Sequence, residues 1–320
     1  MGMLIDGVWT TENHFPTDDK GAFQRKPTTF RDRITADGSS GHPAVAGRYH
    51  LYVSWACPWA HRTLIVRALR GLEDVLPVSY VDAFMGDGGW HFSDRNGSTP
   101  DGLFGKEFLR EVYVEADPSF TGRVTVPVLF DTVTGTIVNN ESTEIIRMLN
   151  DAFGEGLARN AEVDLCPADL RYASDAMRDR IYNRFNNGVY RAGFARSQGA
   201  YEEAAREVFD VLDELDAILA DQRYLVSDDR ITEADICAFT TLVRFDPVYH
   251  THFKCNLRRV ADYAHLPGYL RDLYQTPGVA PTVHLGQIKE HYFRSHESVN
   301  PSRIVPIGPE FDLEAPHGRG

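Results

Sequence analysis

Hydrophobic and polar positions follow two different patterns along this chain of 320 residues. Between residues 48 and 150, short aromatic or β-branched runs alternate with helical patterns, whereas from about residue 165 onward the pattern is helical. Short apolar runs bounded by turn residues predict strands, and apolar residues that recur every three or four positions predict helices. The sequence therefore predicts a mixed α/β part followed by an all-helical part.

The α/β part has its elements in the order β-α-β and then β-β-α. A β-α-β unit pairs its strands in parallel through a right-handed crossover, and the terminal hairpin adds antiparallel strands. This order predicts a thioredoxin-like arrangement. Strands are expected at 49–53, 78–81, 126–130 and 136–138, and helices are expected from Pro58 onward and over 141–149.

The all-helical part is best defined by two segments. In 201–219, apolar residues form one stripe with Glu, Asp and Arg between them, which is typical of a helix that packs along one face. A mostly apolar helix over 236–245 follows Thr232 and Asp235, which resemble a capping box with Asp in place of Glu or Gln. The chain as a whole is expected to comprise an irregular arm (1–47), a thioredoxin-like domain (48–155), an all-helical domain (165–297) and an irregular tail (298–320).

The arm and the tail are rich in residues typical of loops, namely Gly, Pro, Asp, Ser and Thr in the arm and Pro in the tail. Aromatic side chains are interleaved with the polar residues of the arm, so we expect it to pack on the body of the protein. These aromatic residues are Trp9, Phe15, Phe23 and Phe30.

Charge and hydropathy narrow the classes of function. Lys and Arg number 33 and Asp and Glu number 46, so the formal net charge is −13. An acidic surface repels phosphate groups, which disfavours nucleic acids and anionic membranes as partners. No apolar run approaches the roughly 18 residues of a membrane-spanning helix, and the first 20 residues do not resemble a signal peptide. We therefore expect a cytoplasmic protein.

Cys57 is the candidate nucleophile among four widely spaced cysteines. It lies between a predicted strand and a predicted helix, where unpaired N–H groups and the helix dipole favour a thiolate. Cysteine pKa values at such positions are about 3.5–7.5. Residue 60 is Ala, so a mixed disulfide at Cys57 must be resolved by an outside thiol. The alternative is a small buried cysteine, which is how we interpret Cys166, Cys237 and Cys255.

Two later segments complete a candidate thiol site. Val126-Pro127 begins the predicted strand at 126–130. In thioredoxin-like folds a cis proline at such a position presents the N–H and C=O of the residue before it; a trans proline on an edge strand is the alternative. Glu141 and Ser142 follow a predicted strand and start a predicted helix. Glu141 suits an ammonium, and Ser142 with the helix N–H groups suits a carboxylate, which together fit a γ-glutamyl group. The alternative is a plain N-cap.

Six uncommon segments of the chain point to a family: 48–62, 126–127, 141–142, 186–190, 242–249 and 291–296. Together they resemble the glutathione transferases with a catalytic cysteine, and in particular the xi class, the glutathionyl-hydroquinone reductases. The resemblance runs from about residue 30 to the tail. It implies a thioredoxin-like thiol-binding domain joined to an all-helical substrate domain, glutathione as co-substrate, a small aromatic thioether substrate and a homodimer.

The resemblance also assigns roles to individual residues. Cys57 is implied to be the nucleophile, and Tyr190 and Tyr292 are implied to reach the aromatic substrate. Packing in an aromatic core is the alternative for both tyrosines. Glutathione, or another low-molecular-weight thiol in its place, is implied to contact Trp90, Arg123, Val126, Glu141 and Ser142.

The implied reaction is the reduction of glutathionyl-hydroquinones to hydroquinones through a mixed disulfide at Cys57. Two other functions stay open at this point. A general thioltransferase or dehydroascorbate reductase of the omega type would use Cys57 without the tyrosine pair. A non-catalytic scaffold would need no stabilised thiolate.

Histidines are frequent towards the end of the chain and raise the question of a metal site. Zinc sites need three or four ligands in a fixed geometry, and one His-x-His pair with scattered partners is weak support. No metal is predicted. The histidines are His250, His252, His265, His284, His291 and His296.

Overall fold

The computed structural model describes residues 2–11, 17–310 and 312–319. The chain divides into two compact units, which we call the thioredoxin-like unit and the helical unit. The units differ from the domain ranges expected from the sequence. The arm is shared between the two units, and 286–295 belongs to the thioredoxin-like unit. The thioredoxin-like unit comprises 1–14, 27–163 and 286–295, and the helical unit comprises 15–26, 164–285 and 296–320.

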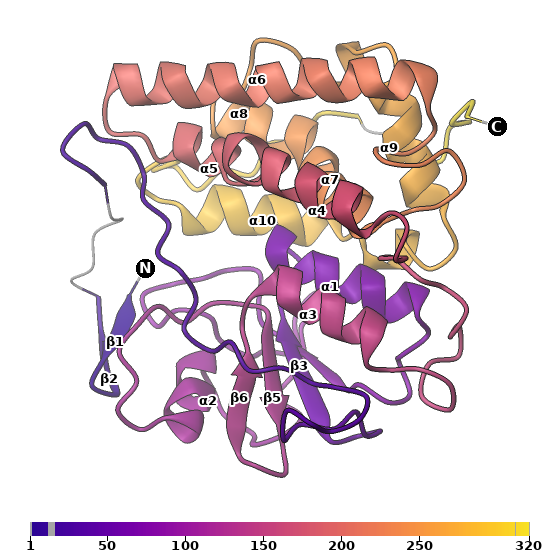
Figure 1. Cartoon of the computed structure of the whole chain (residues 1–320). Coiled ribbons are helices and arrows are strands. Elements are labelled where there is room, and N and C mark those ends of the chain that lie inside the picture. The colour runs from indigo at the N-terminus through magenta and orange to yellow at the C-terminus, as the bar shows by residue number, and fades with distance from the viewer. Residues whose placement is uncertain (1, 12–16, 311, 320) are drawn as a thin grey trace. The chain divides into compact units, whose positions relative to one another are not determined.

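The centre of the thioredoxin-like unit is a four-stranded sheet (Figure 1). Its strands, in spatial order, are β4 (Val78–Tyr80), β3 (Tyr49–Val53), β5 (Val128–Asp131) and β6 (Thr136–Asn139). β3 pairs in parallel with β4 and antiparallel with β5, which in turn pairs antiparallel with β6. Every residue of β3 is buried, as expected for a central strand made of a continuous aromatic and aliphatic run. The predicted thioredoxin-like order is therefore confirmed.

Three helices accompany this sheet. α1 (Pro58–Leu69) and α3 (Ser142–Asp151) pack against each other, and α2 (Leu109–Ala116) contacts β6 (Figure 1). α1 and α3 begin where the sequence predicts helices. α2 lies within 83–120, a stretch for which the sequence predicts no clear element, because eight residues show too little of the helical repeat.

The start of the arm forms a β-hairpin rather than an irregular segment. β1 (Met3–Ile5) and β2 (Val8–Thr10) pair antiparallel, with Leu4 opposite Trp9. The two turn residues, Asp6 and Gly7, have φ values of 47° and 76°. Asp-Gly between apolar residues is the preferred sequence of a two-residue type I′ turn, so the hairpin has a local cause.

Two further aromatic residues in the described part of the arm, Phe23 and Phe30, pack as expected. Phe30 stacks on Phe120 at 5.4 Å in the thioredoxin-like unit, and Phe23 contacts Phe194 at 5.6 Å in the helical unit. Phe15 lies outside the described residues.

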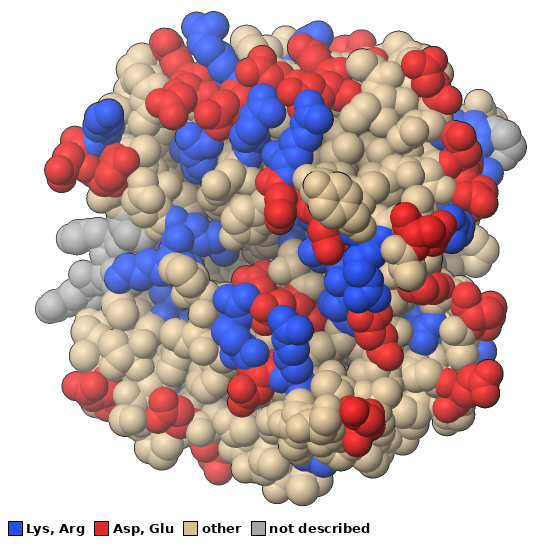
Figure 2. All heavy atoms as spheres, viewed as in Figure 1, with Lys and Arg blue, Asp and Glu red and all other residues tan. Residues whose placement is uncertain are grey.

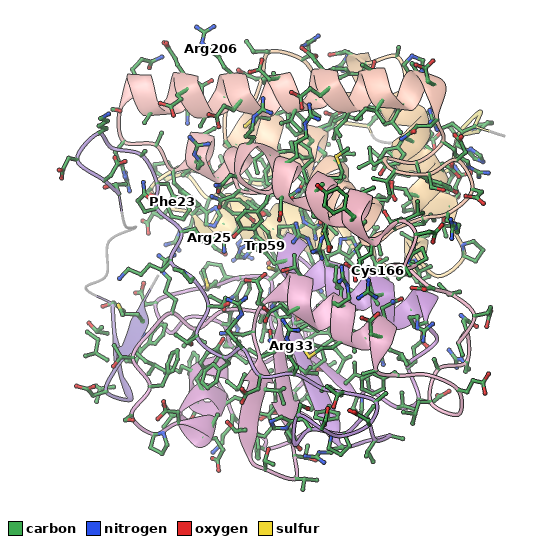
Figure 3. All side chains as sticks on the ribbon, in the orientation of Figure 1. Phe23, Arg25, Arg33, Trp59, Cys166 and Arg206 are labelled. Atoms are coloured by element: carbon green, nitrogen blue, oxygen red, sulfur yellow. The ribbon has the colours of Figure 1, made fainter. Side chains whose placement is uncertain are left out.

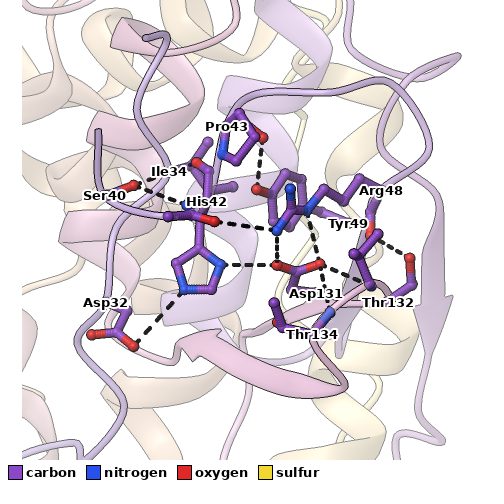
Figure 4. Close-up of polar contacts among 12 residues, drawn as sticks. Asp32, Ile34, Ser40, His42, Pro43, Arg48, Tyr49, Asp131, Thr132 and Thr134 are labelled. Atoms are coloured by element: carbon purple, nitrogen blue, oxygen red, sulfur yellow. Dashed lines mark hydrogen bonds and ion pairs between the residues drawn. The ribbon is translucent and has the colours of Figure 1, made fainter. Parts of the chain in front are cut away.

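Asp131, at the end of β5, holds the arm by polar contacts (Figure 4). Its side chain is fully buried and accepts hydrogen bonds from His42 Nδ1 at 2.8 Å and from Arg48 Nη2 at 2.6 Å. Burial alone would raise the pKa of Asp131, but the hydrogen bonds from Arg48 and His42 hold it well below its usual range. The carboxylate therefore stays ionised and joins residues 42 and 48 to the sheet.

The helical unit is built around α6 (Gln198–Asp221) and α7 (Glu233–Arg244). α7 begins with the predicted capping box, in which Asp235 Oδ2 accepts a hydrogen bond from the Thr232 N–H at 2.8 Å. Charges of both signs mix along α6 (Figure 2), where Glu214 pairs with Arg180 and Arg184. The other helical elements are α4 (Arg171–Ile181), α5 (Gly188–Gly193), α8 (His250–His252), α9 (Leu266–Gln275), two π-helical segments, η1 (Tyr182–Asn186) and η2 (Phe245–Tyr249), and two short 3₁₀ turns, η3 (Val260–Asp262) and η4 (Ala280–Thr282).

The last helix, α10 (Leu285–Ser295), falls almost entirely within the thioredoxin-like unit although it follows the helical unit in sequence. Throughout the described part of the chain, no helix combines the length and the apolar composition needed to cross a membrane.

Candidate functional site

Cys57 occupies the N-cap of α1, directly after β3 and a short turn. Its carbonyl accepts the first helical hydrogen bond, from the His61 N–H at 2.9 Å, while its side chain is half-buried. Pro58 is the first helical residue, where its missing N–H leaves no bond unmade. The thiol is thus held at the positive end of the helix dipole, as the sequence predicts, and still reaches the surface.

The thiol faces the backbone just before β5. The Val126-Pro127 peptide bond is cis, and Cys57 Sγ lies 3.6 Å from the carbonyl oxygen of Val126. The Val126 side chain is buried. The structure therefore joins two of the residues that the sequence proposes for the site, across a separation of 69 residues.

A buried arginine connects α1 to α3. Arg62 Nη1 donates a hydrogen bond to Ser142 Oγ at 3.3 Å, and its guanidinium lies 4.5 Å from the ring centre of Trp59. Trp59 is the second residue of α1 (Figure 3). A guanidinium held beside an aromatic face and a hydroxyl group brings a fixed positive charge to the first residue of α3.

Glu141 is the N-cap of α3, and Ser142 is its first residue. One Glu141 oxygen accepts hydrogen bonds from the N–H and hydroxyl of Thr143, at 3.4 and 3.2 Å. The other accepts from the Thr28 hydroxyl of the arm at 3.3 Å. Glu141 is only partly buried, so it serves as a cap and also presents negative charge at a helix start. Thr28 is a residue that the sequence does not reveal, because it lies 113 positions away.

Trp90 contacts α10 within the thioredoxin-like unit. The buried Trp90 ring stacks on His291 with centroids 4.8 Å apart. His291 Nδ1 in turn lies 2.8 Å from the carbonyl oxygen of Ala83. Tyr292, the next residue, is 1% exposed and shares the unit with Cys57. The sequence analysis proposes Trp90 as a site residue but does not predict its stacking on His291.

Tyr190 belongs to the helical unit, where aromatic rings surround it. Its ring contacts Phe253 at 5.4 Å and Tyr249 at 6.2 Å. The guanidinium of Arg25, from the arm, lies 5.5 Å from the Tyr190 ring centre, and its Nε donates to Asn187 Oδ1 at 3.0 Å (Figure 3). Tyr190 follows η1, and Tyr249 ends η2. Such π-helical turns are frequent at functional sites.

Comparison with known proteins identifies the family. Residues 56–152 match the family described as "Glutathione S-transferase, N-terminal domain", and residues 198–272 match "Glutathione S-transferase, C-terminal domain". Glutathionyl-hydroquinone reductase YqjG of Escherichia coli is 52% identical over 326 residues, which cover 100% of this chain and 98% of that protein. The chain belongs to the xi class of glutathione transferases, the glutathionyl-hydroquinone reductases.

Other relatives of this xi-class chain agree. Glutathionyl-hydroquinone reductase PcpF of Sphingobium chlorophenolicum is 51% identical, covering 97% of this chain and 96% of that protein. "Glutathione S-transferase omega-like 2" of Schizosaccharomyces pombe is 48% identical, covering 92% and 95%. The solved xi-class structure from Natrialba magadii matches with a TM-score of 0.93 and 52% identity, covering 100% of this chain and 96% of the other. The glutathione-bound structure of the E. coli protein matches with a TM-score of 0.91 and 50% identity, covering 99% of each chain.

Seven of the eight residues proposed from the sequence lie in one unit of this xi-class protein. Tyr190 is the exception. Arg123 is half-buried and directly follows Gly122, which pairs with β1. The residues within the thioredoxin-like unit are Cys57, Trp90, Arg123, Val126, Glu141, Ser142 and Tyr292.

The histidines fall into both units. His252 Nε2 lies 3.2 Å from His296 Nδ1 in the helical unit, whereas His291 belongs to the thioredoxin-like unit. Within the described ranges, no three His, Cys, Asp or Glu side chains group closely enough to hold a metal ion.

Proposed function

We propose that this protein reduces glutathionyl-hydroquinones to hydroquinones with glutathione as co-substrate. The observation that carries the proposal is the position of Cys57: the residue occupies the N-cap of α1, its sulfur lies 3.6 Å from the Val126 carbonyl oxygen, and position 60 holds Ala. Such a cysteine is suited to forming a mixed disulfide and has no neighbouring cysteine in sequence to resolve it. Membership of the xi class and the names of the relatives support the same reaction.

The polar groups around the Cys57 thiol match the chemical groups of glutathione. The Val126 backbone lies beside the sulfur, where it can bind the peptide part of the ligand. Glu141 offers a carboxylate to the γ-glutamyl ammonium, and Ser142 with the α3 N-terminus and Arg62 offers donors to the γ-glutamyl carboxylate. We assign Trp90 and Arg123 to the remaining glutathione contacts, as the family resemblance implies.

The first half-reaction breaks the carbon–sulfur bond of the substrate. The Cys57 thiolate attacks the sulfur of the aryl thioether, and a Cys57–glutathione disulfide forms. The leaving carbon is part of an aromatic ring and is a poor leaving group. If the hydroquinone first becomes its keto tautomer, the departing carbon is an enolate whose charge rests largely on oxygen. We assign Tyr190 and Tyr292 as hydroxyl donors to that oxygen, where hydrogen bonds stabilise the charge as it develops. A proton then returns to the ring carbon and hydroquinone leaves.

The second half-reaction regenerates the thiolate. A second glutathione, as its thiolate, attacks the glutathione sulfur of the mixed disulfide and releases glutathione disulfide. The two electrons that reduce the ring carbon thus come from two glutathione sulfurs, one from the substrate and one from the second thiol. The net reaction consumes one glutathione for each hydroquinone formed.

The test is a turnover assay with a glutathionyl-hydroquinone and glutathione. Wild-type protein should release hydroquinone and glutathione disulfide in equal amounts, and Cys57→Ser should release neither. A serine hydroxyl is not ionised near neutral pH and cannot form the disulfide. A glutathionylated Cys57 should accumulate in wild-type protein when the second glutathione is withheld, and mass spectrometry would detect it. Turnover by Cys57→Ser would overturn the mechanism.

A second candidate is a general thioltransferase or dehydroascorbate reductase. The observation in its favour is the name of the S. pombe relative, which is called omega-like. This reaction uses Cys57 in the same way but develops no charge on an enolate oxygen. It is favoured if simple mixed disulfides are reduced much faster than glutathionyl-hydroquinones.

We also infer that the protein acts in a reducing compartment such as the cytoplasm and forms a homodimer. All four cysteines are thiols, which is usual for proteins kept in reducing conditions. The dimer is an expectation from the xi-class family. Light scattering coupled to size-exclusion chromatography tests it, and a mass near the 36.0 kDa of one chain would contradict it.

A further inference from the structure

The N-terminal hairpin touches the chain immediately beside two proposed glutathione contacts. β1 and β2 belong to the same unit as Trp90 and Arg123, and both of these residues lie outside regular strands and helices. The hairpin contacts Asp87 and Gly89 through β2, and it contacts 120–122 through β1 and the turn. It therefore lies next to Trp90 on one side and Arg123 on the other. Figure 1 shows it in indigo at the start of the chain.

On the Trp90 side, the contact is made by Trp9 of β2. Its Nε1–H donates to the carbonyl oxygen of Asp87 at 2.9 Å. Its ring also covers Gly89, where a Cβ would lie only 2.9 Å from the indole, and where φ is +80°. Gly89 therefore serves both the turn and the close approach of Trp9.

An arginine completes this contact. The Arg110 guanidinium lies 5.2 Å from the Trp9 ring centre and 3.8 Å from that of Phe108, and it donates to the carbonyl oxygen of Gly88. Leu109, the residue before Arg110, donates its N–H to the Trp90 carbonyl at 3.0 Å. The residues before Trp90 and the carbonyl of Trp90 itself are thus held by Trp9 and the start of α2.

On the Arg123 side, the contact is a short piece of sheet. Leu4 and Gly122 exchange two backbone hydrogen bonds, each of 2.9 Å. The Gly7 N–H donates to the Phe120 carbonyl at 3.0 Å, and the Asp6 N–H donates to the Thr121 hydroxyl at 2.8 Å. Three consecutive residues before Arg123 are therefore bound by the hairpin.

We propose that the hairpin is a positioning element of the thiol site and that Trp9 is its main positioning residue, acting through Trp90. The inference rests on the proposed function, because that proposal assigns Trp90 and Arg123 to glutathione. Loops without ladder hydrogen bonds are the part of a fold most free to move, and each contact from the hairpin removes part of this freedom. A loop already ordered before glutathione binds loses less conformational entropy on binding, so the hairpin raises affinity without touching the ligand.

The test measures glutathione binding by calorimetry and separately measures kcat and KM. Trp9→Ala removes the ring and the donor, whereas Trp9→Phe keeps a smaller aromatic ring and removes the Nε1–H together with part of the indole that covers Gly89. Val8→Ala is the control on the same strand, since Val8 is 69% exposed. We expect Trp9→Ala to raise the Kd and KM for glutathione about three- to tenfold, the range of one lost hydrogen bond, with kcat at saturating glutathione retained. Trp9→Phe should lie between Trp9→Ala and wild type, and Val8→Ala should match wild type.

A double-mutant cycle separates positioning from general destabilisation. If Trp9 acts through Trp90, the Trp9→Ala change should add little to the Kd once Trp90 is also Ala. Full additivity, an unchanged Kd in Trp9→Ala, or an unchanged Kd in Trp90→Ala would each overturn the inference. Calorimetry needs no turnover, so a failure of the proposed reaction would appear separately, as absent hydroquinone formation by wild-type protein.

Discussion

The imidazole of His291 stacks on the indole of Trp90, with ring centroids 4.8 Å apart and planes 18° from parallel. The contact joins α10 to the loop that follows β4. Ser295 strengthens it, because its hydroxyl accepts the Met85 N–H at 2.9 Å. Gln287, one helical turn before His291, donates to the Asn96 carbonyl. α10 is thus fastened to the loop that carries Trp90, and it brings Tyr292 into the unit that contains Cys57.

Replacing His291 should weaken glutathione binding. His291→Leu loses the stacking on Trp90 and the bond to the Ala83 carbonyl, and we expect the Kd for glutathione to rise by up to about tenfold. His291→Phe is the matched control, because it keeps an aromatic ring on Trp90 and loses only the bond. Titration of intrinsic tryptophan fluorescence with glutathione measures both variants. Equal affinity in wild type and His291→Leu would show that the stack does not support the thiol site.

Alkylation near neutral pH should modify one cysteine. Cys57 is half-buried at a helix N-terminus, which favours the reactive thiolate. Burial raises the pKa of Cys255 to about 12, and Cys166 and Cys237 are buried as well. Iodoacetamide at pH 7 should therefore add a single carbamidomethyl group to the folded protein, on Cys57, as peptide mass spectrometry would show. Cys57→Ser should take up none, and preferential labelling of any buried cysteine would contradict the assignment.

Removing the Glu141 carboxylate should act mainly on the KM for the thiol. Losing a charged contact to the γ-glutamyl ammonium costs about 1.5–3 kcal/mol, or roughly ten- to a hundredfold in KM, with a smaller effect on kcat at saturation. Glu141→Ala also loses the cap of α3, which costs about 0.5–2 kcal/mol of stability. Glu141→Gln is the control, because it keeps an acceptor for the cap while removing the charge. If Glu141→Gln binds glutathione as wild type does, the carboxylate is only a cap.

Variants of Tyr190 and Tyr292 should distinguish the proposed reaction from simple disulfide exchange. Tyr190→Phe and Tyr292→Phe keep the rings and remove the hydroxyl groups that we assign to the enolate oxygen. One lost oxyanion donor costs about 2.7–4 kcal/mol in other enzymes, or a hundred- to a thousandfold in rate. We expect a smaller loss here, because two donors share the charge. The measurement compares reduction of a glutathionyl-hydroquinone with reduction of a simple mixed disulfide for each variant.

Only a selective loss of the hydroquinone reaction supports the assignment of the tyrosines. If both activities fall together, the hydroxyl groups are structural. If neither falls, the tyrosines do not act on the substrate and the thioltransferase is the better description. Thermal unfolding of each variant provides the control. The loss of one hydroxyl hydrogen bond should lower the free energy of unfolding by no more than about 0.5–1.5 kcal/mol.

Acid should weaken the contacts that Asp131 makes with the arm. Hydrogen bonds from Arg48 and His42 hold the pKa of Asp131 well below its unfolded value of about 3.9. A lowered folded-state pKa means that the stabilisation is complete above pH 4 and is lost as the pH falls through the folded-state value. Asp131→Asn should lower the free energy of unfolding at pH 7 by about 3–5 kcal/mol, because Arg48 and His42 lose their ionised partner. Urea unfolding at pH 7, 5, 4 and 3 should show a difference from wild type that shrinks below pH 4, and a pH-independent difference would contradict this account.

Sequence periodicity was enough to locate the elements that carry the reacting sulfur. β3, α1, β5, β6 and α3 follow from alternating and helical patterns over neighbouring residues, and the position of Cys57 at a helix start follows from them. The Thr232–Asp235 cap could also be predicted from the sequence, because both residues lie within one helical turn. The β1–β2 hairpin also had a local signal in Asp6-Gly7, but strands of three residues show too little alternation to stand out in a segment rich in loop residues.

The tertiary structure alone decided which distant segments meet at the site. The 3.6 Å approach of Cys57 to Val126, the bond from Thr28 to Glu141 and the stack of His291 on Trp90 join residues 69, 113 and 201 positions apart. No local pattern encodes such contacts, because they depend on how whole helices and loops pack and which buried groups find partners there. Local propensities therefore determined where the thiol stands, and packing between distant segments determined what surrounds it.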